Sequence, residues 1–397
     1  MLLFLKNKLL WIGLGIIMLA AGVFTFAFMG STVNPSPKEL PLAVVMEDEG
    51  VKQPNGEQLN FGEILVREIK RNDTSSVKWK VFDGKEEAIE AMNEKKLYAA
   101  IVLPQNLTQN IFSLLTDLPT TPASTIIINE GMNQVGVNIA NQIANGVLSN
   151  FNQQIQSQIY AQVEGMKSPI TTDFAKLISN PVTIETEKIN PVPVNNANGN
   201  TPALFTQILW IGTFISSMIL FILARKSNDG NLNLGTIISQ ILSGVLYVTF
   251  ISGTALLLAV HVLDVSISNE ANLLLAMVFI GLCFFLLQSA LLNWIGYIAS
   301  PILILLYFFA MPILTLAPEM LPDVTKDYLY SWVPFRFSLE IFRDILFFDK
   351  GIFDKGIGVI GGIGLVSFVV MGLAIFKPTK RPDKMVESGK GMETSMG

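Results

Sequence analysis

A stretch of 46 residues, from Ala271 to Leu316, contains no Asp, Glu, Lys, Arg or His. A helix rises about 1.5 Å per residue, so about 20 residues cross the roughly 30 Å apolar core of a bilayer. The stretch is too long for one crossing and long enough for two, and turn-forming residues lie in its middle, at Asn293, Gly296 and Ser300-Pro301. Because backbone polar groups must be satisfied internally in lipid, it predicts a helical hairpin inside a membrane.

Charge is also absent from several other apolar stretches. Charged residues make up 15% of the chain, against about 25% in soluble proteins. We therefore predict an α-helical, multi-pass membrane protein with six transmembrane helices, at about 9–29, 204–224, 236–260, 271–291, 298–316 and 357–376. The first apolar run follows Lys6 and Lys8 and is longer than that of a cleavable signal peptide, so we expect an uncleaved anchor.

The distribution of basic residues predicts the orientation of these helices. With the N-terminus inside, the inner segments carry nine basic and four acidic residues, and the outer segments carry 18 basic and 28 acidic residues. Cytoplasmic loops are enriched in Lys and Arg. We therefore expect a plasma-membrane protein with both termini cytoplasmic and residues 30–203 extracellular. Because the basic residues are scattered, we expect no nucleic-acid partner.

Residues 30–203 have the pattern of a large extracellular α/β domain between the first two transmembrane helices. Helical segments at 59–71, 85–96 and 107–115 alternate with strands at 41–46, 77–82, 98–103 and 124–129. Residues 133–165 predict a long helix with one narrow apolar stripe, which either packs on the sheet or forms a stalk or dimer helix. Residues 169–202 are rich in Pro and Asn and predict an extended linker.

The remaining chain divides into an N-terminal inner end with the first helix (1–29), a five-helix bundle (204–376) and a cytoplasmic tail (377–397). Within the bundle, the outer segment 317–356 is too polar to span a membrane and too apolar for a free loop. Its centre mixes aromatic and charged residues and predicts a re-entrant or interfacial amphipathic helix, with candidate functional residues Pro334, Phe335, Arg336, Glu340 and Arg343. The last span is rich in glycine, at Gly358, Gly361, Gly362 and Gly364, which predicts close helix contacts.

No motif of catalysis or metal binding is found in the sequence. The lone His261 fits a helix border, the acidic trio Glu47 to Glu49 either binds a cation or forms a solvated turn, and the single Cys283 excludes an intramolecular disulfide. There is no P-loop for nucleotide hydrolysis. We therefore expect a protein that is not an enzyme and has no catalytic, cofactor or metal site.

The predicted spans contain no acidic or basic residue, whereas ion-coupled carriers usually place such groups in the membrane. This favours an energy source supplied by another protein. Arg225, Lys226 and Asp229 lie on the inner loop where an external motor would act. The alternative is that the two bases only follow the positive-inside rule.

Several segments together resemble a known family. They are PLAVVMEDEG (41–50), the helix with Gly62, YAAIVLPQNLTQNI (98–111), the group Asn129-Glu130 with Asn133, and VPFRFSLEIFRDIL (333–346). In this order they resemble ABC-2-type transporter permeases, and within these the YhgE/Pip (phage infection protein) group.

The resemblance implies the permease subunit of an ABC-type exporter. Such a subunit lies in the lipid bilayer as a homo- or heterodimer, is powered by a separate nucleotide-binding ATPase, and exports a hydrophobic or amphipathic substrate. In such permeases the inner loop, here 225–235, docks on the ATPase, and the outer segment, here 317–356, lines the exit. The alternative function is a non-transport scaffold or receptor, such as a secretion-machinery accessory or a phage attachment protein.

Overall fold

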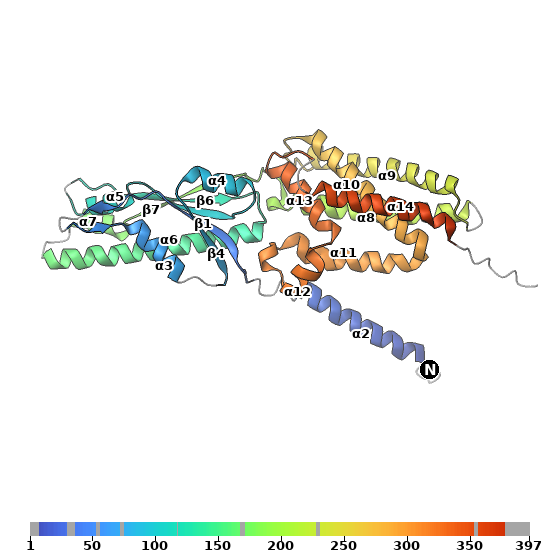
Figure 1. The fold of residues 1–397 in the computed structure, drawn as a ribbon, viewed down its shortest axis with the longest axis horizontal. Coiled ribbons are helices and arrows are strands. Elements are labelled where there is room, and N and C mark those ends of the chain that lie inside the picture. Colours follow the sequence, from blue (N-terminus) through green and yellow to red (C-terminus); the bar gives the residue numbers. More distant parts are fainter. Residues whose placement is uncertain are drawn as a thin grey trace, which may run out of the picture.

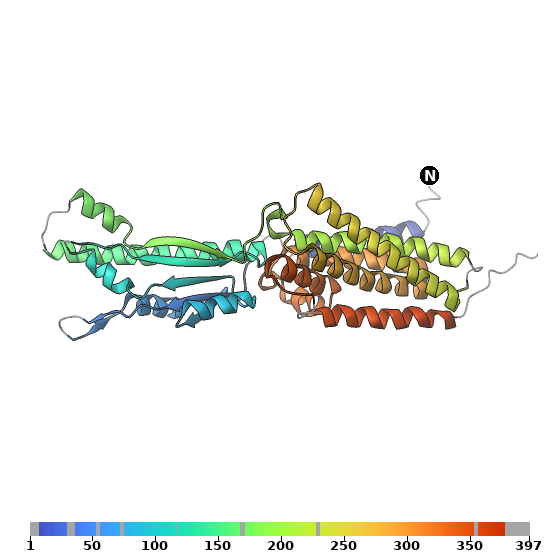
Figure 2. The same ribbon diagram turned by 90° about the horizontal axis from the view of Figure 1, so that it is seen from above.

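The molecule is elongated, with an α/β unit at one end and a helical bundle at the other (Figures 1 and 2). The computed structural model describes residues 8–29, 36–52, 56–71, 75–116, 118–166, 171–227, 231–352 and 356–377. Residues 190–200 connect the last strand of the α/β unit to the bundle.

A five-stranded mixed sheet forms the centre of the α/β unit, in the order β4-β1-β5-β6-β7. The strands are β1 (Leu40–Met46), β4 (Val77–Phe82), β5 (Ala99–Leu103), β6 (Ala123–Asn129) and β7 (Thr183–Ile189). β1 runs parallel to β4 and β5, and β6 runs antiparallel to β5 and parallel to β7. A separate antiparallel pair consists of β2 (Val51–Lys52) and β3 (Gln58–Leu59). The four predicted strands are thus confirmed to within about one residue.

Helices cover both faces of the sheet because β1 and β5 are apolar on both sides. One face is covered by α3 (Phe61–Arg71), α5 (Leu107–Ser113), α6 (Gln134–Met166) and α7 (Thr172–Ser179). α4 (Lys85–Asn93) packs on the other face. The long helix α6 buries its stripe, including Ala140, Phe151 and Ile155, in this core. The prediction that this helix packs on the sheet is confirmed. Ile143 and Val147 of its apolar stripe are only half-buried.

The predicted linker 169–202 is wrong over much of its length, because the described part of it contains α7 and the edge strand β7. β7 is an edge strand in which only Ile184, Glu187 and Ile189 are half-buried and the other positions are exposed. The Pro and Asn residues that flank the strand dominated the composition, and the mostly polar segment itself has no clear strand pattern. Only pairing with β6 identifies it as a strand.

The interpretation of the acidic trio as a cation site or solvated turn is also wrong for Asp48, which is 6% exposed. Its carboxylate accepts hydrogen bonds from the backbone N–H groups of Gly62 (3.1 Å) and Thr108 (3.0 Å) and from the Thr108 hydroxyl (2.5 Å). The carboxylate therefore satisfies donors at the starts of α3 and α5, where anionic groups are favoured.

The bundle contains the apolar helices of the chain. They are α2 (Lys8–Met29), α8 (Thr201–Lys226), α9 (Leu234–His261), α10 (Glu270–Ile295), α11 (Ala299–Thr315) and α14 (Ile357–Leu373), with short 3₁₀ turns η2 (Gly296–Ile298) and η5 (Ala374–Phe376). Among the described residues, four helical stretches are long and apolar enough to cross a membrane: Thr201–Lys226, Leu234–His261, Glu270–Thr315 and Ile357–Phe376. α2 contacts α11 and angles away from the other helices (Figure 1).

The 46-residue stretch Glu270–Thr315 consists of two helices, α10 and α11, joined at η2. Gly296 begins the turn with a φ of 67°, a conformation that glycine adopts without steric cost. The predicted hairpin and the position of its turn are confirmed.

The segment between α11 and α14 lies where the bundle meets the α/β unit. It contains η3 (Pro318–Met320), α12 (Asp323–Thr325), the π-helical turn η4 (Lys326–Tyr330) and α13 (Pro334–Phe347). Ala317 and Met320 belong to the core of the α/β unit, whereas Phe335 and Phe342 of α13 belong to the core of the bundle. A helix at the centre of this segment is confirmed, and it is enclosed by protein on most sides.

Glycines allow close packing at only some of the predicted places. A Cβ on Gly364 of α14 would lie 2.6 Å from Cys283 Sγ of α10, and one on Gly361 would lie 3.3 Å from Phe279. Gly358 and Gly362 have no neighbour within 4 Å of such an atom, so the prediction is wrong for them. The tightest approach is in α9, where a Cβ on Gly244 would lie 2.1 Å from the Phe285 ring.

We expect Gly244→Ala to destabilise the bundle, because the added methyl group must displace the Phe285 ring, and overpacking of this kind costs about 1–3 kcal/mol. Gly253→Ala on the same helix is the matched control, because no atom lies within 4 Å of its added Cβ and alanine favours a helix. Thermal unfolding of the detergent-solubilised protein measures both. Equal melting temperatures would contradict the close α9–α10 contact.

Candidate functional site

Lys95 lies in a backbone conformation that usually requires glycine. It follows α4 with a φ of 62°. The Lys95 N–H donates to Met92 O (2.9 Å) and the Lys96 N–H to Ala91 O (2.9 Å), which together form a Schellman motif. A side chain at this left-handed position costs about 1–2 kcal/mol relative to glycine. Strain of this kind at a long charged residue points to a role for its side chain.

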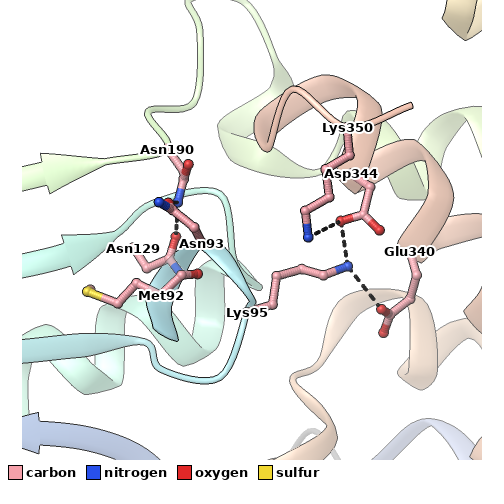
Figure 3. Close-up of polar contacts among 8 residues, drawn as sticks. All are labelled: Met92, Asn93, Lys95, Asn129, Asn190, Glu340, Asp344 and Lys350. Atoms are coloured by element: carbon pink, nitrogen blue, oxygen red, sulfur yellow. Dashed lines mark hydrogen bonds and ion pairs between the residues drawn. The ribbon is translucent and has the colours of Figure 1, made fainter. Parts of the chain in front are cut away.

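The Lys95 side chain crosses from the α/β unit to α13, as Figure 3 shows. Its ammonium lies 2.6 Å from Asp344 Oδ1 and 3.3 Å from Glu340 Oε2, and Lys350 lies 3.9 Å from the same Asp344 oxygen. The side chains are largely buried, at 18% exposed for Lys95 and 6% for Asp344. Buried charges of opposite sign therefore connect the two parts of the molecule.

Two asparagines hold the turn that carries Lys95 (Figure 3). The Asn129 amide donates to Met92 O (2.7 Å) and Leu97 O (3.0 Å), on either side of the turn. The Asn190 amide donates to Asn129 Oδ1 (3.0 Å) and to Asn93 Oδ1 (3.0 Å). These bonds fix the direction in which Lys95 leaves the α/β unit.

The two carboxylates that face Lys95 differ in their environment. Burial raises the pKa of Glu340, but the charges of Lys95, Arg343 and Arg336 outweigh it, so the pKa is lowered overall. Burial raises the pKa of Asp344, and there the attraction of Lys95 and Lys350 does not compensate fully. The surroundings favour the ionised form of Glu340 and disfavour that of Asp344.

A second polar contact lies beside this cluster. The Tyr98 hydroxyl donates to Glu319 Oε2 at 2.9 Å, and burial together with the Glu319 charge raises the pKa of Tyr98. Arg336 lies 4.2 Å above the Tyr330 ring, and the Tyr330 hydroxyl lies 3.4 Å from Glu340. The junction is thus a network in which Glu319 of η3 and charged groups of α13 contact Tyr98, Tyr330 and Lys95.

α13 is also anchored on α8. Pro334 starts α13, where its missing N–H costs nothing. Next to it, Phe335 is fully buried and its ring centre lies 4.5 Å from that of Trp210 in α8. The hydroxyls of Ser338 and Thr206 lie 2.7 Å apart. α8 and α13 therefore contact each other through both apolar and polar groups.

Neutral polar groups connect α8 to the rest of the bundle. Gln288 of α10 donates to Trp210 O (3.1 Å), Ser217 donates to Phe285 O (3.3 Å), and Asn293 donates to Gln240 Oε1 of α9 (3.0 Å). Side-chain hydrogen bonds of this kind hold transmembrane helices together, each contributing about 0.6 kcal/mol on average. The residues are fully buried, so they link α8, α9 and α10 within the apolar interior.

The far end of the bundle carries the other predicted site. Arg225 and Lys226 lie in the last turn of α8, where the helix dipole favours positive charge. The Arg225 guanidinium lies 5.3 Å from the centre of the Phe221 ring. Asp229 lies outside the described residues. Lys377, which follows η5, donates to Trp294 O at the end of α10. Hence the ends of α8, α10 and α14 lie together, away from the α/β unit (Figure 1).

The structure brings together Pro334, Phe335, Arg336, Glu340 and Arg343 on one short helix and separates them from Arg225 and Lys226 by the length of α8. Sequence reasoning missed the partners from the α/β unit, above all Lys95. In the sequence Glu94-Lys95-Lys96 has the composition of a solvated helix end. No local signal distinguishes the buried lysine from the exposed one next to it.

Among the residues that the structure describes, no cluster of three or more His, Cys, Asp or Glu has a geometry suited to a metal ion. The site is therefore characterised by its ion pairs and by its position between two structural units.

A family model described as "Protein of unknown function (DUF3533)" matches residues 13–373. The chain belongs to this family. The match extends from α2 to the end of α14, so the α/β unit, the junction and the bundle are all parts of one DUF3533 unit. No curated protein matches the chain.

We expect Lys95→Ala to destabilise the protein by about 3 kcal/mol, because it leaves the buried Asp344 carboxylate and the one-third exposed Glu340 carboxylate without their shared cation. Lys95→Gly should be less damaging by about 1 kcal/mol, because it also removes the left-handed strain. Chemical unfolding of the purified protein compares the two. Lys96→Ala is the control, because that side chain is 57% exposed; a cost equal to that of Lys95→Ala would contradict the role of the buried ion pairs.

The opposite pKa shifts predict that Glu340→Gln destabilises the protein more than Asp344→Asn at neutral pH. A lowered pKa means that the fold gains stability from ionised Glu340, whereas a raised pKa means that the fold loses stability by ionising Asp344. When the pH falls toward 3.8, the ordinary pKa of Asp, Asp344 becomes protonated and the wild type regains the stability that ionisation of Asp344 had cost. Asp344→Asn lacks this recovery, so its melting temperature should fall more steeply with decreasing pH. Parallel melting curves for wild type and variant would contradict the assignment.

Proposed function

We propose that this protein is the membrane subunit of an exporter that is driven by a separate ATPase and moves a hydrophobic or amphipathic substrate out of the cell. One observation carries the proposal: a single continuous helix, α8, links the basic turn at the far end of the bundle to α13, which is ion-paired to the α/β unit. The resemblance to ABC-2-type permeases supports the same conclusion.

The proposed arrangement in the membrane has six crossings, with α2 and both helices of the α10–α11 hairpin included. The start of α2 with Lys8, the end of α8 with Lys226 and the end of η5, which Lys377 follows, all lie at the end of the bundle away from the α/β unit (Figure 1). A basic end of the bundle favours the cytoplasmic side. The α/β unit would then be extracellular, and both ends of the chain would be cytoplasmic.

α8 has the properties of a lever in this scheme. Its 26 residues span about 39 Å at 1.5 Å per residue. An ATPase that moves the turn after Lys226 would tilt α8 as one body, because the helix is continuous from Thr201 to Lys226. Its hydrogen bonds to α10 at Trp210 and Ser217 would carry α10 with it. The contact between Thr206 and Ser338 would pass this tilt to α13. The substrate would be released as α13 shifts against Lys95.

The proposal explains why the ionisable groups lie outside the apolar helices. Carriers coupled to an ion gradient usually hold acidic or basic groups in the membrane, whereas a chain driven by a partner's ATP hydrolysis needs only a mechanical link. In this scheme two permease subunits and two ATPase subunits form the working unit. The second permease subunit would be either a copy of this chain or a related one.

The test is purification of the full-length protein in a mild detergent from its native membrane. We expect an ATPase to co-purify and Arg225→Ala/Lys226→Ala to reduce its recovery by about tenfold or more, because the turn loses both charges. Lys8→Ala is the control, since this base lies at the same end of the bundle on a different helix.

Retention of the ATPase by the double variant would contradict the assignment of the docking turn. Purification of the protein without any ATPase would contradict the exporter function itself. Recovery with cell-wall or secretion components instead would favour the scaffold function, in which the α/β unit is the working part.

A further inference from the structure

A cavity of about 1420 Å³ lies where the α/β unit meets α8 and α9. Its walls come from the start of α6, from the segment 192–198 and from the facing halves of α8 and α9 next to the α/β unit. The size exceeds the usual range of about 300–1,000 Å³ for small-molecule pockets. The cavity therefore has room for a large ligand.

The walls divide into a polar and an apolar part. Amide side chains gather on the side of the α/β unit, from Gln134, Asn138, Asn195, Asn196 and Asn198. Aliphatic and aromatic side chains line the side of the bundle, from Leu204, Ile208, Phe250, Leu258 and Leu263. A ligand that fills the cavity must have a polar head and an apolar body.

The apolar part opens toward the outer surface of the bundle. Phe250, Leu258 and Leu263 on or just after α9 and Leu204 on α8 are all exposed. In a bilayer these side chains would face lipid. The apolar body of a ligand could then remain in the membrane while its head contacts the amides.

The charge of the cavity selects the head group. Among the described lining residues Glu130 alone is charged, and its carboxylate is already bound by Lys188 (2.6 Å) and by the Val192 N–H (3.1 Å). Without a lysine or arginine in the wall, a phosphate or carboxylate head finds no cation. Amides both donate and accept hydrogen bonds and match hydroxyl groups, which do the same.

Two features of the polar wall are energetically unfavourable for the fold. Asn196 is 1% exposed, and its amide donates to Ser266 O (2.9 Å), yet its Oδ1 has no hydrogen-bond partner. A buried acceptor without a donor costs about 1–3 kcal/mol. Asn195, Ala197 and Asn198 have positive φ angles of 62°, 50° and 51°, and such strain collects at ligand sites.

We propose that this cavity binds a lipid-like amphiphile whose head is uncharged and rich in hydroxyl groups, as in a sugar-headed lipid. The exposed amides of Asn138, Asn195 and Asn198 bind the hydroxyls of the head, and the apolar chain lies along α8 and α9. The inference deepens the proposed function, on which it rests for the statement that this amphiphile is the exported cargo. Binding itself does not depend on an ATPase.

The test uses the full chain in phosphatidylcholine nanodiscs without an ATPase. The probe is a glucose-headed lipid with a photoreactive group in its chain, compared with a phosphate-headed lipid of the same chain. We expect the glucose-headed probe to label α8 and α9 at the cavity about tenfold more than the phosphate-headed probe at equal concentration. Peptide mass spectrometry locates the labelled residues.

Matched variants show whether the label reports the cavity. Thr254→Trp places a bulky ring at an exposed lining position and should reduce labelling about tenfold. Leu257→Trp, which is equally exposed on α9 but does not line the cavity, should leave labelling unchanged. Should either tryptophan variant fail to fold, Asn138→Leu with Gln142→Leu as its control on α6 makes the same comparison.

Equal labelling by both probes, label spread evenly over the lipid-facing helices, or labelling that survives Thr254→Trp or Asn138→Leu would overturn the proposal. Because no ATPase is present, such a result would leave the exporter function standing. Conversely, purification of the protein without an ATPase would not contradict ligand binding in this cavity.

Discussion

The ion pairs between Lys95 and the carboxylates of α13 are the interaction on which the arrangement of the molecule depends. The α/β unit and the bundle each have a core of their own, and they meet where the chain between α11 and α14 belongs partly to both. A largely buried ammonium needs its partners within a few ångströms, because charges removed from water are costly unless paired. The two parts are therefore fixed to each other by geometry as well as by contact area.

The junction and the bundle use different polar chemistry. Ionised groups connect the two parts where the chain lies outside the apolar helices, whereas α8, α9 and α10 are tied to one another by hydroxyl and amide side chains such as Ser217, Gln288 and Asn293. Neutral groups can be buried among apolar helices at moderate cost once they are hydrogen-bonded, whereas an ionised group there is expensive. The proposed movement along α8 relies on this combination of a bundle joined by neutral groups and a charged connection at one end.

The cavity beside the junction extends this division of chemistry. Its polar side is furnished by the α/β unit and the strained segment 192–198, and its apolar side by the bundle helices. Neither part alone encloses it. A relative movement of the two parts would change the shape of the cavity, because both parts contribute to its walls.

The sequence by itself determined the apolar helices, the hairpin turn at Gly296, four strands of the sheet and the helix at 334–347, because hydrophobic periodicity and turn chemistry are local properties of a chain. It also indicated that Arg336, Glu340 and Arg343 belong to an amphipathic helix outside the membrane-spanning helices. The tertiary structure alone decided that β7 completes the sheet, that Asp48 caps two helices, and that Lys95 reaches α13. These depend on residues that are distant in the sequence, as Lys95 and Asp344 are, and no local pattern records which distant group will lie within hydrogen-bonding distance.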